Sequence, residues 1–297
     1  MHFFRNITAF SFPKKLDLTE LEPALEVLAF QPCAPQALSS EGFVPVEGEG
    51  SDAPRYVREC SGAYLVAVQA ESRVLPRRVV DEQLGARLKE IELKEGRHPG
   101  GRERRRLKEE LVADLLARSF TVKDRTRALL DGERGLLLVE TSSRKAAENI
   151  ASHLRSALGS FPCVPLSTRV APCTWMSSMV RDGQLPAPMT LGESCVLKGG
   201  ESSQVTIKRL DLGGEEVLGH LTAGMSVARL ALDSPELFGF ELDETLVVHK
   251  FNCHVEVEMP DEGELLAALD TRVFLLVSHY RKLIDVLDDQ LGINFAD

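Results

Sequence analysis

GRERRRLKEELVADLLARSF, residues 101–120, has leucines that recur at the spacing of an α-helix. Leu107, Leu111 and Leu115 fall on one stripe, and Val112 lies beside it. The first eight residues of the stretch also hold four arginines and one lysine. The pattern predicts an amphipathic helix with concentrated positive charge near its N-terminal end. Cations there oppose the helix dipole, so helix stability does not explain their placement.

A second amphipathic helix is expected immediately before this one. Val80, Leu84, Leu88 and Ile91 recur every three or four residues. The RHPGG that follows must end this helix, because proline lacks a backbone N–H and glycine frees the backbone. The sequence therefore predicts a helical hairpin over residues 76–118, which we call the basic arm.

The positive charge of the basic arm contrasts with the rest of the chain. The 297-residue protein has a formal net charge of −10, whereas residues 87–127 hold 13 Lys and Arg against 8 Asp and Glu. Residues 233–297 hold 4 basic and 15 acidic side chains. The positive field is therefore local. A solvated helical face accounts for such a run as well as a binding surface does, so the residues alone leave both interpretations open.

The remaining segments alternate between strand-like and helix-like patterns, which indicates an α+β fold with mixed or antiparallel sheets and long amphipathic helices. FFRNITAFSF and GAYLVAVQAES favour strands, and LTELEPALEVLAF favours a helix capped by Thr19. GLLLVETSS and RKAAENIASHLRSALGS favour a strand and then a helix that ends at Gly159. The expected regions are a central α/β region (residues 1–75 and 119–168), the basic arm (76–118), a β-rich module (169–232) and an acidic C-terminal α+β region (233–297).

No stretch of the sequence predicts a catalytic site. GHLTAGM has the glycine spacing of a phosphate-binding loop, but Met225 stands where that loop needs a lysine. Glu92 and Lys94 form an ExK pair of the kind found in nucleases, yet they lie in an expected helix and lack an acidic partner on a nearby strand. We therefore expect a protein that is not an enzyme and uses no cofactor.

Metal binding and membrane insertion are not indicated either. His249, Cys253 and His254 could be zinc ligands, but a zinc site takes four and no second pair follows at a recognisable spacing. We expect these three to be ordinary strand residues, and we expect the six irregularly spaced cysteines to be reduced. The chain has no apolar run of about 18 residues and no continuous apolar segment near residue 1. A cytoplasmic protein is expected.

Several short stretches together resemble the bacterial recombination-associated protein RdgC family. They follow one another in the same order and spacing over nearly the whole chain, and no single one is diagnostic. They are LAFQPC (28–33), GFVP (42–45), RVLP (73–76), LLARSF (115–120), LGSFPCVPLS (158–167), VARLALD (227–233) and a terminal apolar helix that ends in LG.

The resemblance implies a protein that binds double-stranded DNA with little sequence preference and without catalysis. Elongated subunits would pair head to head and tail to tail into a closed ring-shaped homodimer, with the duplex in a positively lined hole. The β-rich module would be finger-like. Such a protein would limit access of the recombinase RecA to DNA, modulate recombination and replication, and associate with the nucleoid rather than with a membrane.

A ring around DNA needs basic side chains on its inner wall, and phosphate contacts do not depend on base sequence. Some of the arginines that could supply them should instead pair with Glu103, Glu109 or Glu110. The candidate DNA contacts are Arg97, Arg102, Arg104, Arg105, Arg106 and Lys108 on the basic arm, Arg118, Lys123, Arg125 and Arg127 after it, and Lys208 and Arg209 in the β-rich module.

At three further positions the residue either matches the family pattern or departs from it. Phe120 matches an aromatic residue that the resemblance places at a contact between subunits; the alternative is a core phenylalanine that caps its own helix. Leu210 and Met225 stand where relatives have a polar residue and a lysine. These two departures move the expected DNA binding away from the β-rich module and toward the basic arm.

A different function also fits the charge segregation. The basic arm could dock an acidic protein partner, and the acidic C-terminal region could contact the arm of another subunit. In that case DNA would bind poorly even at low salt, and dimerisation itself would weaken as salt is added.

Overall fold

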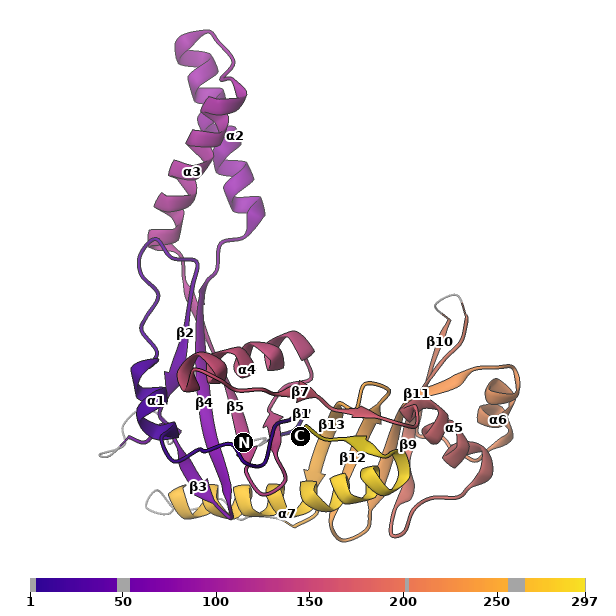
Figure 1. The fold of residues 1–297 in the computed structure, drawn as a ribbon. Coiled ribbons are helices and arrows are strands. Elements are labelled where there is room, and N and C mark those ends of the chain that lie inside the picture. The colour runs from indigo at the N-terminus through magenta and orange to yellow at the C-terminus, as the bar shows by residue number, and fades with distance from the viewer. Residues whose placement is uncertain (1–3, 47–53, 201–202, 256–264, 297) are drawn as a thin grey trace. The chain divides into compact units, whose positions relative to one another are not determined.

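The computed structural model describes residues 4–46, 54–200, 203–255 and 265–296. The described chain is an α+β protein with seven helices and antiparallel sheets (Figure 1), as the sequence predicts. It divides into two compact units, and each is described by itself. The first comprises Met1–Val27, Pro45–Ala67 and Thr126–Asp297, and the second comprises Leu28–Val44 and Val68–Arg125.

The larger sheet has seven strands in the order β2-β4-β5-β6-β1-β7, with β3 paired to β4. Every residue of β1 and β6 is buried, and β6 is the uninterrupted apolar run LLLV, as expected for a central strand. The strands are β1 (Thr8–Ser11), β2 (Ser39–Val44), β3 (Arg58–Cys60), β4 (Ala63–Arg73), β5 (Thr121–Asp131), β6 (Leu136–Val139) and β7 (Val164–Pro165).

Two helices of the first unit, α1 (Leu21–Val27) and α4 (Arg144–Leu158), pack against each other. The hydroxyl of Ser143 accepts a hydrogen bond from the N–H of Ala146 at 3.3 Å and caps α4, and Gly159 ends it with a φ of 71°. The predicted stop at Gly159 is confirmed. Thr19 does not cap α1, because its hydroxyl donates instead to the carboxylate of Asp17 at 2.7 Å.

The smaller sheet has five strands in the order β10-β9-β11-β12-β13. They are β9 (Thr190–Lys198), β10 (Gln204–Lys208), β11 (Ser226–Ser234), β12 (Phe238–Asp243) and β13 (Val248–Cys253). Helix α5 (Pro172–Asp182) packs on β11 and contacts α6 (Glu215–Thr222). The hydroxyl of Ser177 on α5 accepts the N–H of Val227 at 2.8 Å. The sheet contains strands from both sides of residue 232, where the sequence analysis drew a boundary.

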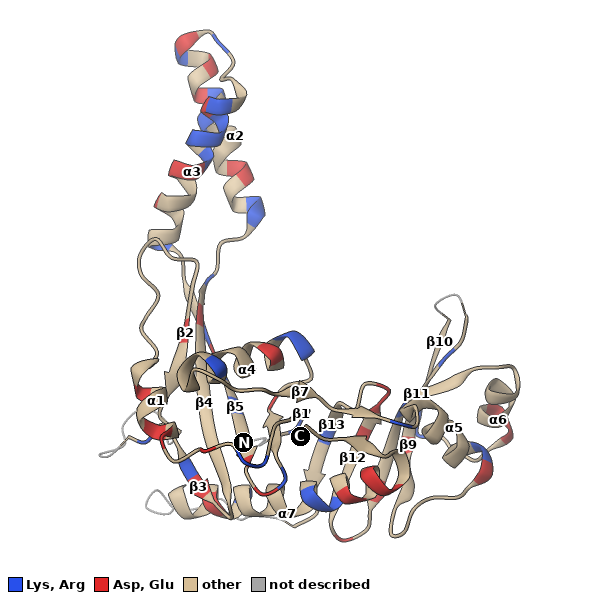
Figure 2. Ribbon diagram, in the orientation of Figure 1, with Lys and Arg blue, Asp and Glu red and all other residues tan. Residues whose placement is uncertain are grey.

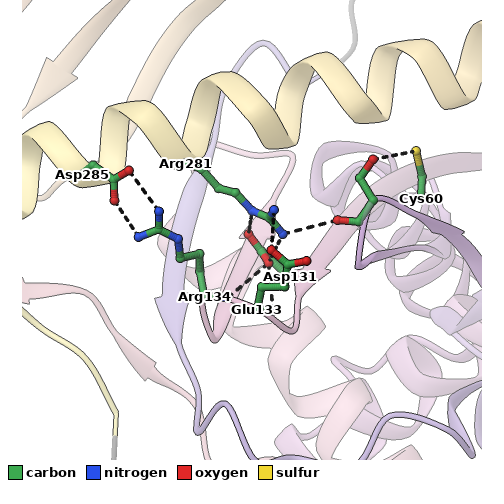
Figure 3. Close-up of polar contacts among 7 residues, drawn as sticks. Cys60, Asp131, Glu133, Arg134, Arg281 and Asp285 are labelled. Atoms are coloured by element: carbon green, nitrogen blue, oxygen red, sulfur yellow. Dashed lines mark hydrogen bonds and ion pairs between the residues drawn. The ribbon is translucent and has the colours of Figure 1, made fainter.

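The last helix, α7 (Leu265–Leu291), is bound to the turn between β5 and β6 by arginine–carboxylate pairs (Figure 3). Arg281 reaches from α7 and donates two hydrogen bonds to Asp131, both of 2.7 Å, and its third nitrogen lies 2.7 Å from Glu133. The bonds to Asp131 raise the pKa of Arg281. Arg134 reaches the other way and binds Asp285 at 2.6 and 3.0 Å. Beyond α7, β14 (Ile293–Asn294) pairs with β8 (Ser167–Thr168).

Candidate nucleic-acid interface

The basic arm consists of two helices, α2 (Arg77–Glu95) and α3 (Gly101–Arg118), which pack against each other in the second unit. Gly96 ends α2 in the left-handed region at a φ of 66°. The apolar stripes meet between the helices, but only Val80, Leu111 and Leu116 are fully buried. A two-helix hairpin leaves most of its surface in solvent, so its charged side chains are exposed. Figure 2 shows basic and acidic residues interspersed along both helices.

Arg97 lies in the turn of the arm and is bound by two carboxylates. Its terminal nitrogens donate to Glu103 at 2.6 and 2.8 Å, and its Nε donates to Glu95 at 2.7 Å. The bonds to Glu103 raise the pKa of Arg97 and lower the pKa of Glu103. A phosphate would therefore have to compete with Glu103 for this guanidinium.

Three further cations of α3 are paired but remain exposed. Arg105 and Arg106 each bind the glutamate four residues later, at 3.1 and 3.3 Å, and Lys108 lies 3.6 Å from Asp81 on α2. Exposed pairs contribute at most about 1 kcal/mol, so a phosphate can replace them at little cost. The expectation that some of these arginines pair with nearby glutamates is confirmed.

Four candidates have no such partner. The side chains of Arg102, Arg104, Arg118 and Lys123 are exposed and make no hydrogen bond or ion pair with the part of the chain that the structure describes. Arg102 precedes Arg105 by three residues and Arg106 by four, so these three arginines share one face of α3. The arm thus presents accessible positive charge even though many of its other cations are paired.

The two candidates on β5 are less accessible. Arg125 is half-buried. The side chain of Arg127 is 14% exposed and binds Glu140 at 3.2 Å. Arg127 would have to leave Glu140 before it could reach a phosphate.

The basic pair of the β-rich module lies in the first unit. Lys208 is the last residue of β10, and Arg209 follows with a left-handed φ of 56°. Both side chains are exposed. The next residue, Leu210, is 41% exposed, so an apolar side chain stands in solvent beside the pair.

Phe120 is 86% exposed, which excludes the alternative of a core phenylalanine. Its carbonyl accepts the N–H of Val74 at 2.8 Å, and Val74 and Val122 are themselves 45% and 54% exposed. We call these three residues the Phe120 patch. The end of α3 beside it is fixed by Arg73, whose guanidinium donates to the carbonyl of Leu116 at 2.8 Å. An exposed aromatic on a fixed backbone is typical of an interface.

The residues considered as metal ligands have other partners. His249 Nε2 lies 2.7 Å from Asp243, and His254 binds a different aspartate at 2.9 Å. Cys253 Sγ lies 3.4 Å from His279 Nδ1, and burial raises the pKa of this thiol. All six cysteines are free. Within the described ranges, no three His, Cys, Asp or Glu side chains are grouped so as to hold a metal ion, and no helix is long and apolar enough to cross a bilayer.

One feature of the smaller sheet was not predicted from the sequence. The face of the sheet that carries Lys208 lines a cavity of about 600 Å³, together with Arg229 and Glu241. The alternation of polar and apolar residues in QVTIK (204–208) is the signal that could have identified an open sheet face here.

Comparisons with known proteins agree over nearly the whole chain. The family model described as "Putative exonuclease, RdgC" matches residues 2–294. Proteins named "Recombination-associated protein RdgC" from Xanthomonas campestris pv. campestris (strain B100), Xanthomonas oryzae pv. oryzae (strain MAFF 311018) and Xylella fastidiosa (strain 9a5c) are 37%, 36% and 34% identical. Each match covers 99% of this chain and 99%, 100% and 99% of the respective relative. The family description mentions an exonuclease, whereas the names of the relatives mention recombination. On this full-length similarity, the chain belongs to the RdgC family of recombination-associated proteins.

Proposed function

We propose that this protein binds double-stranded DNA through the phosphate backbone, without sequence preference and without catalysis. The observation that carries the proposal is the run of exposed arginines on α3, namely Arg102, Arg104, Arg105 and Arg106. Their guanidiniums are unpaired or weakly paired, so a polyanion can bind them and release its counterions. Contacts to phosphates position a protein on DNA but carry no sequence information.

The charge distribution supports the same proposal. Residues 87–127, which comprise most of the basic arm and the start of β5, carry a net charge of +5 in a chain of net charge −10. An approaching duplex is repelled by the acidic remainder and attracted by the basic arm. The arm is therefore the favoured site of encounter.

We further propose that two subunits form a ring around the duplex and thereby limit the access of RecA to DNA. Family membership supports this step, as does the recombination-associated name of the relatives. In a dimer both subunits contribute the cations of their basic arms, which strengthens the binding of DNA by a protein whose overall charge is negative. A nucleoid association would follow from DNA binding.

The proposal is tested by competition. A fluorescent duplex bound to the protein is displaced with unlabelled duplexes of the same length and different base sequences, in the presence of Mg²⁺. We expect all competitors to act at concentrations within about twofold of one another, because phosphate contacts are shared by all sequences. The labelled duplex should keep its length. A strong preference for one sequence, or shortened DNA, would contradict the proposal.

Replacement of Phe120 by serine is expected to weaken self-association. Truncation of a central aromatic residue in an interface costs about 2 kcal/mol, which raises the dimer dissociation constant roughly 30-fold. Sedimentation velocity over a concentration series measures this change. Leu93→Ser is the matched control, because Leu93 is 88% exposed on α2 and lies outside the Phe120 patch. Equal dissociation constants for the two variants would show that Phe120 is not at the contact.

A second candidate function is the docking of an acidic protein on the basic arm. The observation that favours it is the pairing of Arg97, Arg105 and Arg106 with glutamates, because carboxylates of a partner could exchange with those of the arm. This alternative predicts weak DNA binding at every salt concentration, so the competition experiment separates it from the first proposal.

A further inference from the structure

Segments that are far apart in the sequence meet at the end of β4. The backbone N–H of Arg73, the last residue of this strand, donates to the carbonyl of Leu38 at 2.9 Å. The next N–H, that of Val74, donates to the carbonyl of Phe120 at 2.8 Å. All four residues belong to the second compact unit. The backbone of β4 thus connects the segment before β2 with the end of the basic arm.

The side chain of Arg73 makes the same connection a second time. Its guanidinium donates to the carbonyls of Leu116 and Ser119 at the end of α3, at 2.8 and 3.5 Å. It also donates to the carbonyls of Cys33 and Ala34 before β2, both at 3.4 Å. A guanidinium has five N–H donors in a fixed plane, so one arginine can bind both segments at once. The single ammonium of a lysine could not span them.

The carbonyl of Leu116 is the most strongly bound acceptor of this group. Besides the guanidinium of Arg73, it accepts the backbone N–H of Ser119 at 3.2 Å and the hydroxyl of Ser119 at 2.9 Å. Ser119 has an extended backbone, with φ −76° and ψ 148°, so the chain passes directly from α3 toward β5. Phe120 is the next residue, and Val74 binds its carbonyl. The backbone is therefore fixed on both sides of Phe120.

The phenyl ring of Phe120 does not hold itself in place. It is 86% exposed, so burial within the subunit contributes little to its position. The direction in which the ring leaves the surface depends on the backbone on either side of it. The hydrogen bonds of Arg73 and Val74 are therefore the contacts that set the position of the Phe120 patch.

Stability alone does not explain an arginine at this position. Among the residues that the structure describes, no carboxylate pairs with Arg73, and its buried Nε has no hydrogen-bond partner. The buried carboxylate of Glu71 accepts the N–H of Cys33 at 2.6 Å instead. A half-buried cation without a carboxylate costs desolvation energy that an apolar side chain would avoid. What only the arginine provides is a planar set of donors that reaches both segments.

We propose that Arg73 is a positioning residue for self-association, which holds the Phe120 patch in the arrangement that a second subunit binds. The inference rests on the proposed ring of two subunits and on the Phe120 contact between them. A surface that is already ordered loses less conformational entropy on binding than one that must be ordered at each encounter. Loss of the guanidinium should therefore weaken association even though the patch keeps all three of its side chains.

A double-mutant cycle between Arg73 and Phe120 tests the inference. Arg73→Gln is expected to raise the dimer dissociation constant roughly tenfold, because the patch is no longer pre-ordered. In the Phe120→Ser background, the same change should alter the dissociation constant by less than about twofold, since no phenyl ring remains to be positioned. Sedimentation velocity measures all four proteins. If the two effects multiply to roughly 300-fold, Arg73 acts independently of Phe120 and the inference is overturned.

Two further variants control for charge and for folding. Arg78→Gln removes the same charge from α2, where Arg78 is 89% exposed, and should leave the dissociation constant at the wild-type value. If far-UV circular dichroism shows that Arg73→Gln does not fold, the cycle is repeated with Arg73→Lys, which keeps the charge but cannot span both segments. For Arg73→Lys we expect a rise of about threefold that disappears in the Phe120→Ser background. A wild-type dissociation constant for this variant would overturn the inference.

The cycle separates failure of the inference from failure of the proposed function. If Phe120→Ser weakens association and Arg73→Gln folds but associates like wild type, the inference fails while the Phe120 contact stands. If Phe120→Ser associates as tightly as wild type, the contact itself is absent and both fail. The measurements contain no DNA, so DNA binding by the basic arm is tested independently of either outcome.

Discussion

Replacement of Arg102, Arg104, Arg105 and Arg106 by alanine is expected to lower the affinity for random-sequence duplex about 100-fold at ~0.15 M salt. The loss of four phosphate contacts would by itself lower the affinity roughly 1,000-fold at this salt concentration, because each contact changes the slope of log affinity against log salt by about 0.9. The expected loss is smaller because Arg105 and Arg106 are already paired with glutamates. Fluorescence anisotropy with a labelled duplex measures the change.

The matched control removes the same charge from the other helix of the arm. Arg77, Arg78, Lys89 and Lys94 on α2 are exposed, and their replacement by alanine alters the net charge by the same amount. We expect this variant to lose much less affinity. Equal losses would show that net charge, rather than the face of α3, controls binding. An unchanged affinity of the α3 variant would show that its arginines are only a solvated face. The Lys208–Arg209 pair would then be the next candidate for the DNA contact.

The second large effect concerns stability. Asp131→Ala is expected to lower the free energy of unfolding of the first unit by about 3 kcal/mol, because it removes the buried carboxylate that binds two nitrogens of Arg281. The exposed Glu133 would pair with the third nitrogen and replace this carboxylate only in part. The side chain of Asp131 is 3% exposed, and it also accepts the backbone N–H groups of Glu133 and Arg134. Urea unfolding followed by the fluorescence of Trp175, the single tryptophan and a buried one, measures the change.

Asp285→Ala is the control for this prediction, since it removes a carboxylate from the neighbouring pair of the same helix. Arg134 and Asp285 are 38% and 51% exposed, and exposed pairs contribute at most about 1 kcal/mol. A loss of stability as large as that of Asp131→Ala would mean that burial of the Arg281–Asp131 pair does not decide its contribution. A negligible effect of Asp131→Ala would contradict the role assigned to this pair in binding α7.

The elements that the sequence predicted well are those fixed by local signals. The two helices of the basic arm follow from leucine periodicity, and their break follows from the proline and glycines between them. Helix α4 likewise begins after Ser143 and ends at Gly159, where the cap and the left-handed glycine are local features. Helix α5 had such signals too, with Pro172 at its start and Gly183 after its end, but the surrounding β-prone composition obscured them.

The accessibility of the candidate site depends on contacts that no local pattern specifies. Arg127 is bound by Glu140 from the next strand, and Lys108 is approached by Asp81 from the other helix of the arm. The exposure of Phe120 is likewise set by how the chain leaves α3. The cavity beside Lys208 combines residues of all five strands of the smaller sheet, including β12, which was not predicted from the sequence. Such features arise from tertiary pairing, so composition and periodicity could suggest a basic surface but could not define which cations are available on it.

We expect exposed cations of this acidic protein to bind DNA phosphates. The most direct measurement is a salt titration of the binding of wild type and of the four-arginine α3 variant to a random-sequence duplex. For wild type we expect log affinity to fall linearly with log salt, with a slope of roughly −0.9 for each phosphate contacted, and we expect a clearly shallower slope for the variant. Equal affinity of wild type at low and high salt would contradict the account.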